Sequence, residues 1–189
     1  MLEKFKGKYR IKSARLQNWD YSWNGLYFIT ICTQNREFYF GDVVKGEMIL
    51  SAIGEIVKKY WYEIPKNFPF VELDEFVVMP NHIHGIIIIN KKDDNESHPD
   101  RDAINRVCTD VGGITGIKNP MLSDNLSRII RWYKGRVSFE SRKIHLDFTW
   151  QSRFHDHIIR NDESLQRIRD YISNNPIRWR GDKFYNEYR

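Results

Sequence analysis

The sequence is poor in cysteine and contains no long hydrophobic run. Only Cys32 and Cys108 occur among 189 residues, too few for a disulfide framework or a zinc ribbon. No apolar run approaches the roughly 18 residues of a membrane-spanning helix, and the first residues, MLEKFKGKYR, lack the apolar centre of a signal peptide. We therefore expect a reduced, cytoplasmic protein without a membrane anchor.

Aromatic residues and positive charge are well represented. Aromatic side chains make up 14% of the chain and charged side chains 29%, which is typical of a folded protein. The length suffices for one domain with its own core, so we expect residues 1–189 to form a single domain. A net charge of +5 with a pI near 9.1 favours an anionic partner, without choosing between nucleic acid and a membrane surface.

Apolar periodicity predicts strands and helices over most of the chain. Strands are predicted at 25–33, 37–40, 43–50, 70–78 and 82–89, where β-branched and aromatic residues alternate or run together. Helices are predicted to begin at Ser51, Ser123 and Asp162 and to end near residues 64, 137 and 176. Gly41-Asp42 is the expected turn between the second and third strands, and residues 79–81 form the expected bend before the last.

Two segments lack this periodicity. Residues 1–22 carry six cations against two acids, with Tyr9, Trp19 and Tyr21 among them. This pattern suits either a basic arm on a nucleic-acid backbone or an ordinary solvated terminus. Residues 91–122 include the polar run KKDDNESHPDRD and a glycine-rich stretch, which predicts a mobile surface insertion.

The most informative stretch is Met79-Pro80-Asn81-His82-Ile83-His84-Gly85, which continues into four isoleucines. Because alternate side chains of a strand share a face, His82 and His84 point to the same side while Ile83 points into the core. Two neighbouring imidazoles supply two ligands for a divalent metal, although an isolated His-x-His also arises by chance. His155 and His157 form a second such pair, but charged residues surround it and no β-branched strand follows it.

The third predicted helix adds further groups of the right chemistry. Tyr171 and Asn175 are four residues apart and share a helical face at the margin of the apolar stripe. The amide oxygen of Asn175 can complete a His82, His84, Asn175 ligand set for Mg²⁺ or Mn²⁺. The phenol of Tyr171 can then attack a phosphorus atom polarised by that metal, although half-buried tyrosines at the edge of a core are common.

These residues resemble a known family. PNHIHGIIII and DYISNNPIRW, with GLYFITICTQNRE and WQSRFHDHIIR, are similar to the HUH single-tyrosine transposases, in particular the bacterial REP-associated tyrosine transposase group. The resemblance implies an α+β fold, a ferredoxin-like antiparallel sheet with flanking helices. It also implies that His82 and His84 bind the metal and that Tyr171 is the nucleophile. Asn175 stands where relatives carry a metal-binding Gln, which shortens the reach by one methylene.

The activity implied by this resemblance is metal-dependent cleavage and rejoining of single-stranded DNA. Tyr171 would form a 5′-phosphotyrosine at hairpin-bearing DNA ends, with a free 3′-OH leaving. The expected partner is therefore single-stranded or hairpin DNA rather than a membrane, with the protein a monomer or homodimer. The cations expected to hold this DNA are Lys4, Lys6, Lys8, Arg10, Arg15, Arg128, Arg131, Arg153, Arg160 and Arg178.

Three other functions stay open at this point. A histidine-triad nucleotide hydrolase is disfavoured because such enzymes need a third alternating histidine, and position 86 is Ile86. A replication initiator shares the HUH chemistry but usually carries further domains. A domesticated protein that binds or nicks hairpin DNA without mobilising it would keep the same motifs. Spacing alone also leaves open whether Tyr171 acts within its own subunit or in a neighbour.

Overall fold

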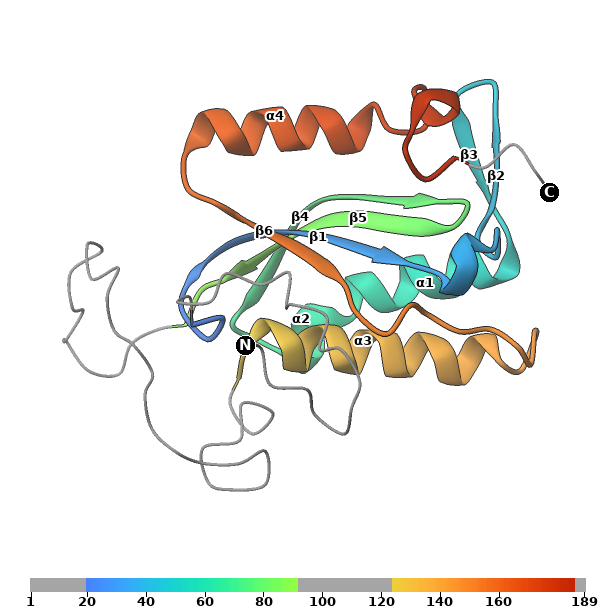
Figure 1. The fold of residues 1–189 in the computed structure, drawn as a ribbon. Helices are drawn as coiled ribbons and strands as arrows, with labels where there is room; N and C mark the ends of the chain where they lie inside the picture. Colours follow the sequence, from blue (N-terminus) through green and yellow to red (C-terminus); the bar gives the residue numbers. More distant parts are fainter. Residues whose placement is uncertain (1–19, 92–123, 186–189) are drawn as a thin grey trace, which may run out of the picture.

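The computed structural model describes residues 20–91 and 124–185 and shows an antiparallel sheet with helices on both faces (Figure 1). The strand order is β4 (Val71–Met79), β5 (His82–Ile89), β1 (Gly25–Cys32) and β6 (His155–Ile159). Helices α1 (Ala52–Tyr62) and α3 (Leu126–Ser141) cover one face, and α4 (Asp162–Ser173) covers the other (Figure 1). The α+β fold with a ferredoxin-like antiparallel sheet is confirmed.

The segment between β1 and α1 differs from its prediction. The predicted strand at 37–40 is irregular and follows a 3₁₀ turn, η1 (Gln34–Arg36). The predicted strand at 43–50 is a hairpin of β2 (Gly41–Val44) and β3 (Glu47–Leu50). Its turn is Lys45-Gly46 and not Gly41-Asp42, because Lys45 and Gly46 both take the left-handed backbone that a two-residue hairpin loop requires.

The helix ends follow their capping residues. The Ser51 side chain accepts a hydrogen bond from the Gly54 amide at 3.0 Å, as the predicted cap of α1. Helix α3 begins at Leu126 and not at Ser123, because Asn125 caps it. Helix α4 begins at Asp162 as predicted, with Asn161 as its cap, but it ends at Ser173. Short helices α2 (Ile64–Asn67) and η2 (Trp179–Gly181) complete the described chain, in which no helix is long and apolar enough to cross a membrane.

Strand β5 is buried on both faces, and its alternation divides the interior in two. Ile83 and Ile87 belong to the large core that α1 and α3 cover, whereas Ile86 packs with Ile172 of α4. The two-residue hairpin that joins β4 to β5 pairs Met79 with His82, so the predicted bend at 79–81 is confirmed. This register places both histidines of β5 on the face that α4 covers.

Gly85 lies on the face of β5 that α1 covers, where a bulky neighbour leaves no room for a side chain. The indole of Trp61 on α1 stacks on Phe76 with ring centroids 4.5 Å apart and presses against β5. A Cβ added at Gly85 would lie 2.3 Å from an indole carbon of Trp61. The glycine that follows the histidine pair therefore serves packing on the opposite face of the sheet.

We predict that Gly85→Ala destabilises the protein, because the added methyl group forces Trp61 out of its stack. Overpacking of this kind costs about 1–3 kcal/mol, measurable as a lower midpoint in urea unfolding. Gly135→Ala is the matched control: no atom outside the helix lies within 4 Å of the added Cβ, so helix propensity should raise stability by about 0.5–1 kcal/mol. Equal midpoints for the two variants would contradict this account of Gly85.

Candidate active site

His82 and His84 lie side by side on β5, as predicted. Their Nε2 atoms are 3.1 Å apart, and the side chains are 0% and 1% exposed. Phe28 of β1 stacks on His84 at 5.2 Å between ring centroids, and Phe184 contacts His82 at 4.4 Å. The pair therefore forms a rigid, enclosed wall of the site.

Buried hydrogen bonds fix the orientation of each ring. Asn81 donates from its Nδ2 to the carbonyl oxygens of Arg36 and Phe184, so its Oδ1 must face His82. The Nδ1 of His82, 2.8 Å away, donates to that oxygen and leaves Nε2 as a bare acceptor. The Nδ1 of His84 lies 2.8 Å from the hydroxyl of Thr30. Both rings thus direct Nε2 into the same space.

Burial keeps both imidazoles uncharged. Loss of hydration lowers the pKa of His84 to about 3, with Lys183 acting in the same direction and a backbone hydrogen bond to Ile29 opposing it. Burial also holds the pKa of His82 well below its usual range, helped by the neighbouring His84. Neutral imidazoles are the form that binds metal ions.

Tyr171 reaches the same site from α4, the helix that covers the histidine face of the sheet. Its hydroxyl lies 3.1 Å from Nε2 of His84 within the same chain, so the predicted nucleophile and the predicted ligand meet in one subunit. Phe28 contacts the Tyr171 ring edge-on at 6.1 Å. Burial raises the pKa of Tyr171, Asp182 raises it further, and a hydrogen bond from Asn175 lowers it. A nearby positive charge would offset the first two effects.

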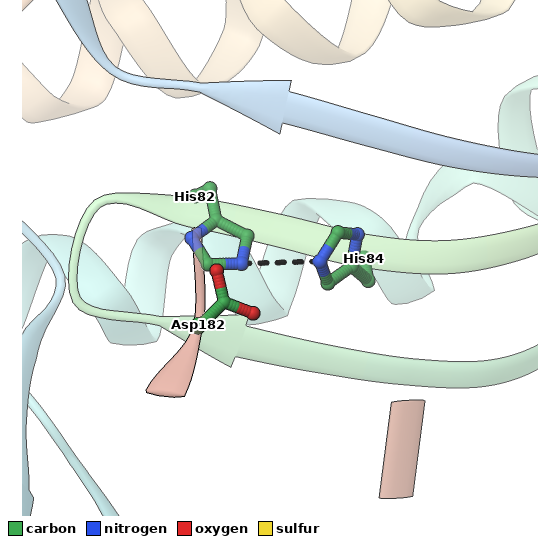
Figure 2. A group of neighbouring side chains, drawn as sticks. All are labelled: His82, His84 and Asp182. Carbon is green, nitrogen blue, oxygen red and sulfur yellow. Dashed lines mark hydrogen bonds between the residues drawn. The ribbon is translucent and has the colours of Figure 1, made fainter. Parts of the chain in front are cut away.

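The C-terminal segment supplies a carboxylate that the sequence interpretation missed. Asp182, just after η2, lies beside both rings (Figure 2). Its oxygen and one nitrogen of each histidine all lie within 4.8 Å of one another, and they form a possible metal-binding group in the described part of the chain. Nothing in the stretch Arg178-Trp179-Arg180-Gly181-Asp182 distinguishes this acid from a surface residue, so the sequence carried no signal for it.

Asn175 lies next to this group, although not as predicted. Helix α4 ends before it, so Asn175 follows the helix instead of extending the face of Tyr171. Its side chain is 2% exposed, and Nδ2 donates to Asp182 Oδ2 at 3.4 Å. Its Oδ1 is buried without a hydrogen-bond partner in the structure. An unsatisfied acceptor of this kind calls for a missing donor or cation.

These atoms fit a divalent cation. One nitrogen of each imidazole and a carboxylate oxygen of Asp182 converge, and the neighbouring Asn175 has an unpaired amide oxygen. Two nitrogens bound at about 2.1 Å to one ion in a right-angled arrangement lie about 3 Å apart, as His82 and His84 do. Mixed nitrogen and oxygen ligands suit Mn²⁺, and oxygen-rich sites suit Mg²⁺.

The predicted DNA-binding cations are spread over the molecule. Lys4, Lys6, Lys8, Arg10 and Arg15 lie outside the described residues, as do nearly all of the arm and the insertion. Arg128 and Arg131 are on α3, across the sheet from Tyr171, and Arg128 forms an ion pair with Asp124 at 2.5 Å. Arg153 and Arg160 flank β6, and exposed Arg178 lies between α4 and η2. His155 and His157, the rival pair, are exposed on edge strand β6.

Comparison with known proteins identifies relatives over almost the whole chain. An uncharacterized protein of Haemophilus influenzae is 37% identical over 182 residues, covering 95% of each chain. A second protein of that organism, named "Putative REP-associated tyrosine transposase", is 26% identical over 160 residues, covering 84% of this chain and 74% of its own. No family model matches the sequence.

A solved structure shares the fold. The REP-associated tyrosine transposase bound to a REP hairpin superposes with a TM-score of 0.53 at 20% identity, covering 91% of this chain and 73% of its own. In this chain the strand of paired histidines faces the tyrosine helix on one side of the antiparallel sheet. The chain is similar to the REP-associated tyrosine transposases in sequence and in fold.

We predict that the metal-free protein loses stability as the pH falls below 6.5. The folded-state pKa of His84 is about 3 against an ordinary 6.5, so between these values the unfolded chain binds more protons. At about pH 5 the loss from His84 alone is on the order of 2 kcal/mol, measurable by urea unfolding in chelator. His84→Asn should flatten this dependence. His157→Asn, which changes an exposed ring, should leave the pH dependence of stability unchanged. The same dependence of stability on pH in all three proteins would refute the assignment of this effect to His84.

Proposed function

We propose that this protein is a metal-dependent nickase and strand transferase of single-stranded DNA at hairpin-bearing ends, with Tyr171 as its nucleophile. One observation carries the proposal: the Tyr171 hydroxyl lies 3.1 Å from a histidine nitrogen of a group able to hold a divalent ion. The similarity to a REP-associated tyrosine transposase that was solved bound to a REP hairpin supports hairpin DNA as the ligand. His82, His84 and Asp182 hold the ion in this proposal, with Asn175 Oδ1 as a further oxygen.

The reaction balances without a redox partner. The oxygen of Tyr171 loses its proton and attacks the phosphorus of a phosphodiester. The bond to the 3′ oxygen breaks, that oxygen takes up a proton and leaves as a 3′-OH, and the 5′ phosphate stays on Tyr171. In rejoining, another 3′-OH loses its proton and attacks this phosphotyrosine, and the phenol regains a proton. A bound divalent ion would supply positive charge for the phosphate oxygens and for the phenolate.

The chain itself contributes position and proton control. The β4–β5 register sets the two imidazoles, and α4 brings the phenol to them. The enclosed site raises the pKa of Tyr171, so its hydroxyl keeps its proton until positive charge is present. The hydrogen bond from Asn175 to the phenol favours the ionised form and opposes the effect of burial.

A protein that binds hairpin DNA without cutting it is the second candidate. It is favoured by the enclosure of the histidine pair, since both side chains are almost fully buried. The two candidates make opposite predictions for a covalent adduct with DNA.

We predict that the wild-type protein, with Mn²⁺ or Mg²⁺, forms a covalent adduct with hairpin-bearing single-stranded DNA and that Tyr171→Phe abolishes it. The variant keeps the ring and loses only the oxygen, so DNA and metal binding should persist. The adduct is measured on a denaturing gel, and peptide mapping locates the attached residue. Tyr62→Phe, an exposed tyrosine on α1, is the control. An adduct that survives in Tyr171→Phe would eliminate this nucleophile, and binding without adduct in wild type favours the second candidate.

We also predict that Mn²⁺ binding depends on His84 and Asp182. His84→Ala and Asp182→Asn should each weaken affinity roughly 10-fold or more, measured by calorimetry or by the loss of the free Mn²⁺ resonance signal. Asp170→Asn on the outer side of α4, where Asp170 bonds to Gln166, should not change it. Wild-type affinity in Asp182→Asn, with loss in Asn175→Ala, would instead support the originally predicted ligand set.

A further inference from the structure

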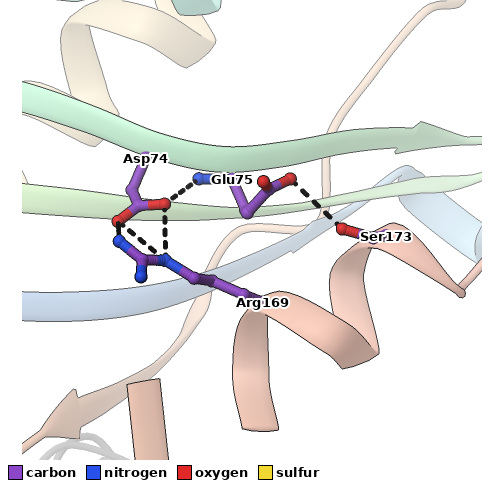
Figure 3. A network of polar contacts seen from close by, with 4 residues as sticks. All are labelled: Asp74, Glu75, Arg169 and Ser173. Carbon is purple, nitrogen blue, oxygen red and sulfur yellow. Dashed lines mark hydrogen bonds and ion pairs between the residues drawn. The ribbon is translucent and has the colours of Figure 1, made fainter. Parts of the chain in front are cut away.

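The turn of α4 that carries Tyr171 is bound to an irregularity in β4. Leu73 pairs with Ile87 and Phe76 with Gly85, so Asp74 and Glu75 together oppose one residue of β5. This is a β-bulge, which re-aims the side chains of the bulged strand. Both bulge residues are acidic, and both direct their carboxylates at α4 (Figure 3).

Two polar contacts join the bulge to α4. Arg169 donates from Nε to both carboxylate oxygens of Asp74 at 3.0 and 3.2 Å, and from Nη2 to Oδ2 at 2.5 Å. Ser173 donates to the carboxylate of Glu75 at 3.3 Å. Arg169 lowers the pKa of Asp74, as expected of a bidentate charged pair. The two helix residues are one turn apart and flank Tyr171 along the axis.

The apolar contacts between α4 and the sheet define the position of the helix less sharply than these polar contacts do. Leu165, Ile168 and Ile172 pack on Ile86 and Ile159 of the sheet. Apolar contacts are not directional, so they favour the buried face without fixing where the helix lies along the sheet. A bidentate arginine–carboxylate pair has defined geometry and therefore does fix it. The proposed reaction tolerates little displacement of the Tyr171 phenol, because its hydroxyl must stay near His84.

We propose that Asp74 and Glu75 of the bulge, through Arg169 and Ser173, are positioning residues that set the Tyr171 hydroxyl against the histidine pair. The inference rests on the proposed function for its kinetic consequence, but the placement of the phenol can be tested without it. The four residues act through α4, and none of them belongs to the group of His82, His84 and Asp182.

The first test measures placement directly. 3-Fluorotyrosine at position 171 reports its surroundings by ¹⁹F NMR in the full chain, without metal or DNA. The wild type should give one resonance, displaced from that of the unfolded chain. Arg169→Gln and Asp74→Asn should move or split it. Arg167→Gln should not, since Arg167 reaches Ser164 on its own helix. An unchanged resonance in both pair variants, at wild-type melting temperature, overturns the proposal.

The second test separates positioning from general destabilisation. In Arg169→Gln, kcat for nicking of hairpin-bearing single-stranded DNA should fall roughly 10- to 100-fold, with KM and Mn²⁺ affinity unchanged. The exchange Asp74→Arg with Arg169→Asp should restore part of kcat and the wild-type resonance. Failure of this exchange to restore either, or a parallel loss of Mn²⁺ affinity, would count against a positioning role.

If a variant unfolds, the milder variants Glu75→Gln and Ser173→Ala take its place. For these we expect a smaller loss of kcat and a smaller ¹⁹F shift. Wild-type values of both quantities would contradict the proposal. If the wild type shows no nicking at all, the proposed function fails, whereas the ¹⁹F comparison still decides the role of the bulge.

Discussion

The structure depends on one constraint: β5 must bury two imidazoles on one face while its other face completes the main core. Burial of polar groups is tolerated only when their hydrogen bonds are met. Asn81 meets this need for His82, and Thr30 lies within hydrogen-bonding distance of Nδ1 of His84. These bonds engage the Nδ1 side of each ring and direct the Nε2 atoms toward one another. The arrangement that stabilises the histidines in the fold is also the one that presents them to a cation.

The same enclosure explains the state of the tyrosine. Its raised pKa follows from burial and from the carboxylate of Asp182. The carboxylate that raises this pKa also favours a positive ion in the site. Without that ion the phenol keeps its proton and is a poor nucleophile. Under the proposed function, a cation bound beside Tyr171 would lower the pKa of its phenol and make the oxygen more reactive.

Local sequence signals predicted most of the fold and part of the site. The isoleucine run identified β5, Ser51 marked the start of α1, and the alternation of His82 and His84 was correct because it depends only on strand geometry. The predicted turn at Gly41-Asp42 was wrong, and the turn at Lys45-Gly46 was missed because Lys45 adopts a left-handed backbone that its residue type does not favour. Asp182 could not be foreseen, since a loop beyond the last long helix brings it to the histidines through tertiary contacts. The bulge at Asp74 and Glu75 likewise depends on pairing with β5 and leaves no mark in the sequence.

The placement of α3 and α4 on opposite faces of the sheet has a geometric consequence for any long ligand (Figure 1). Arg131 lies on one side of a continuous four-stranded layer, and Tyr171 lies on the other. A polymer that touched both would have to pass around the sheet, either at an edge strand, β4 or β6, or at the ends of the strands. A straight duplex cannot follow such a path, whereas a folded stem with an unpaired tail has the corner it requires.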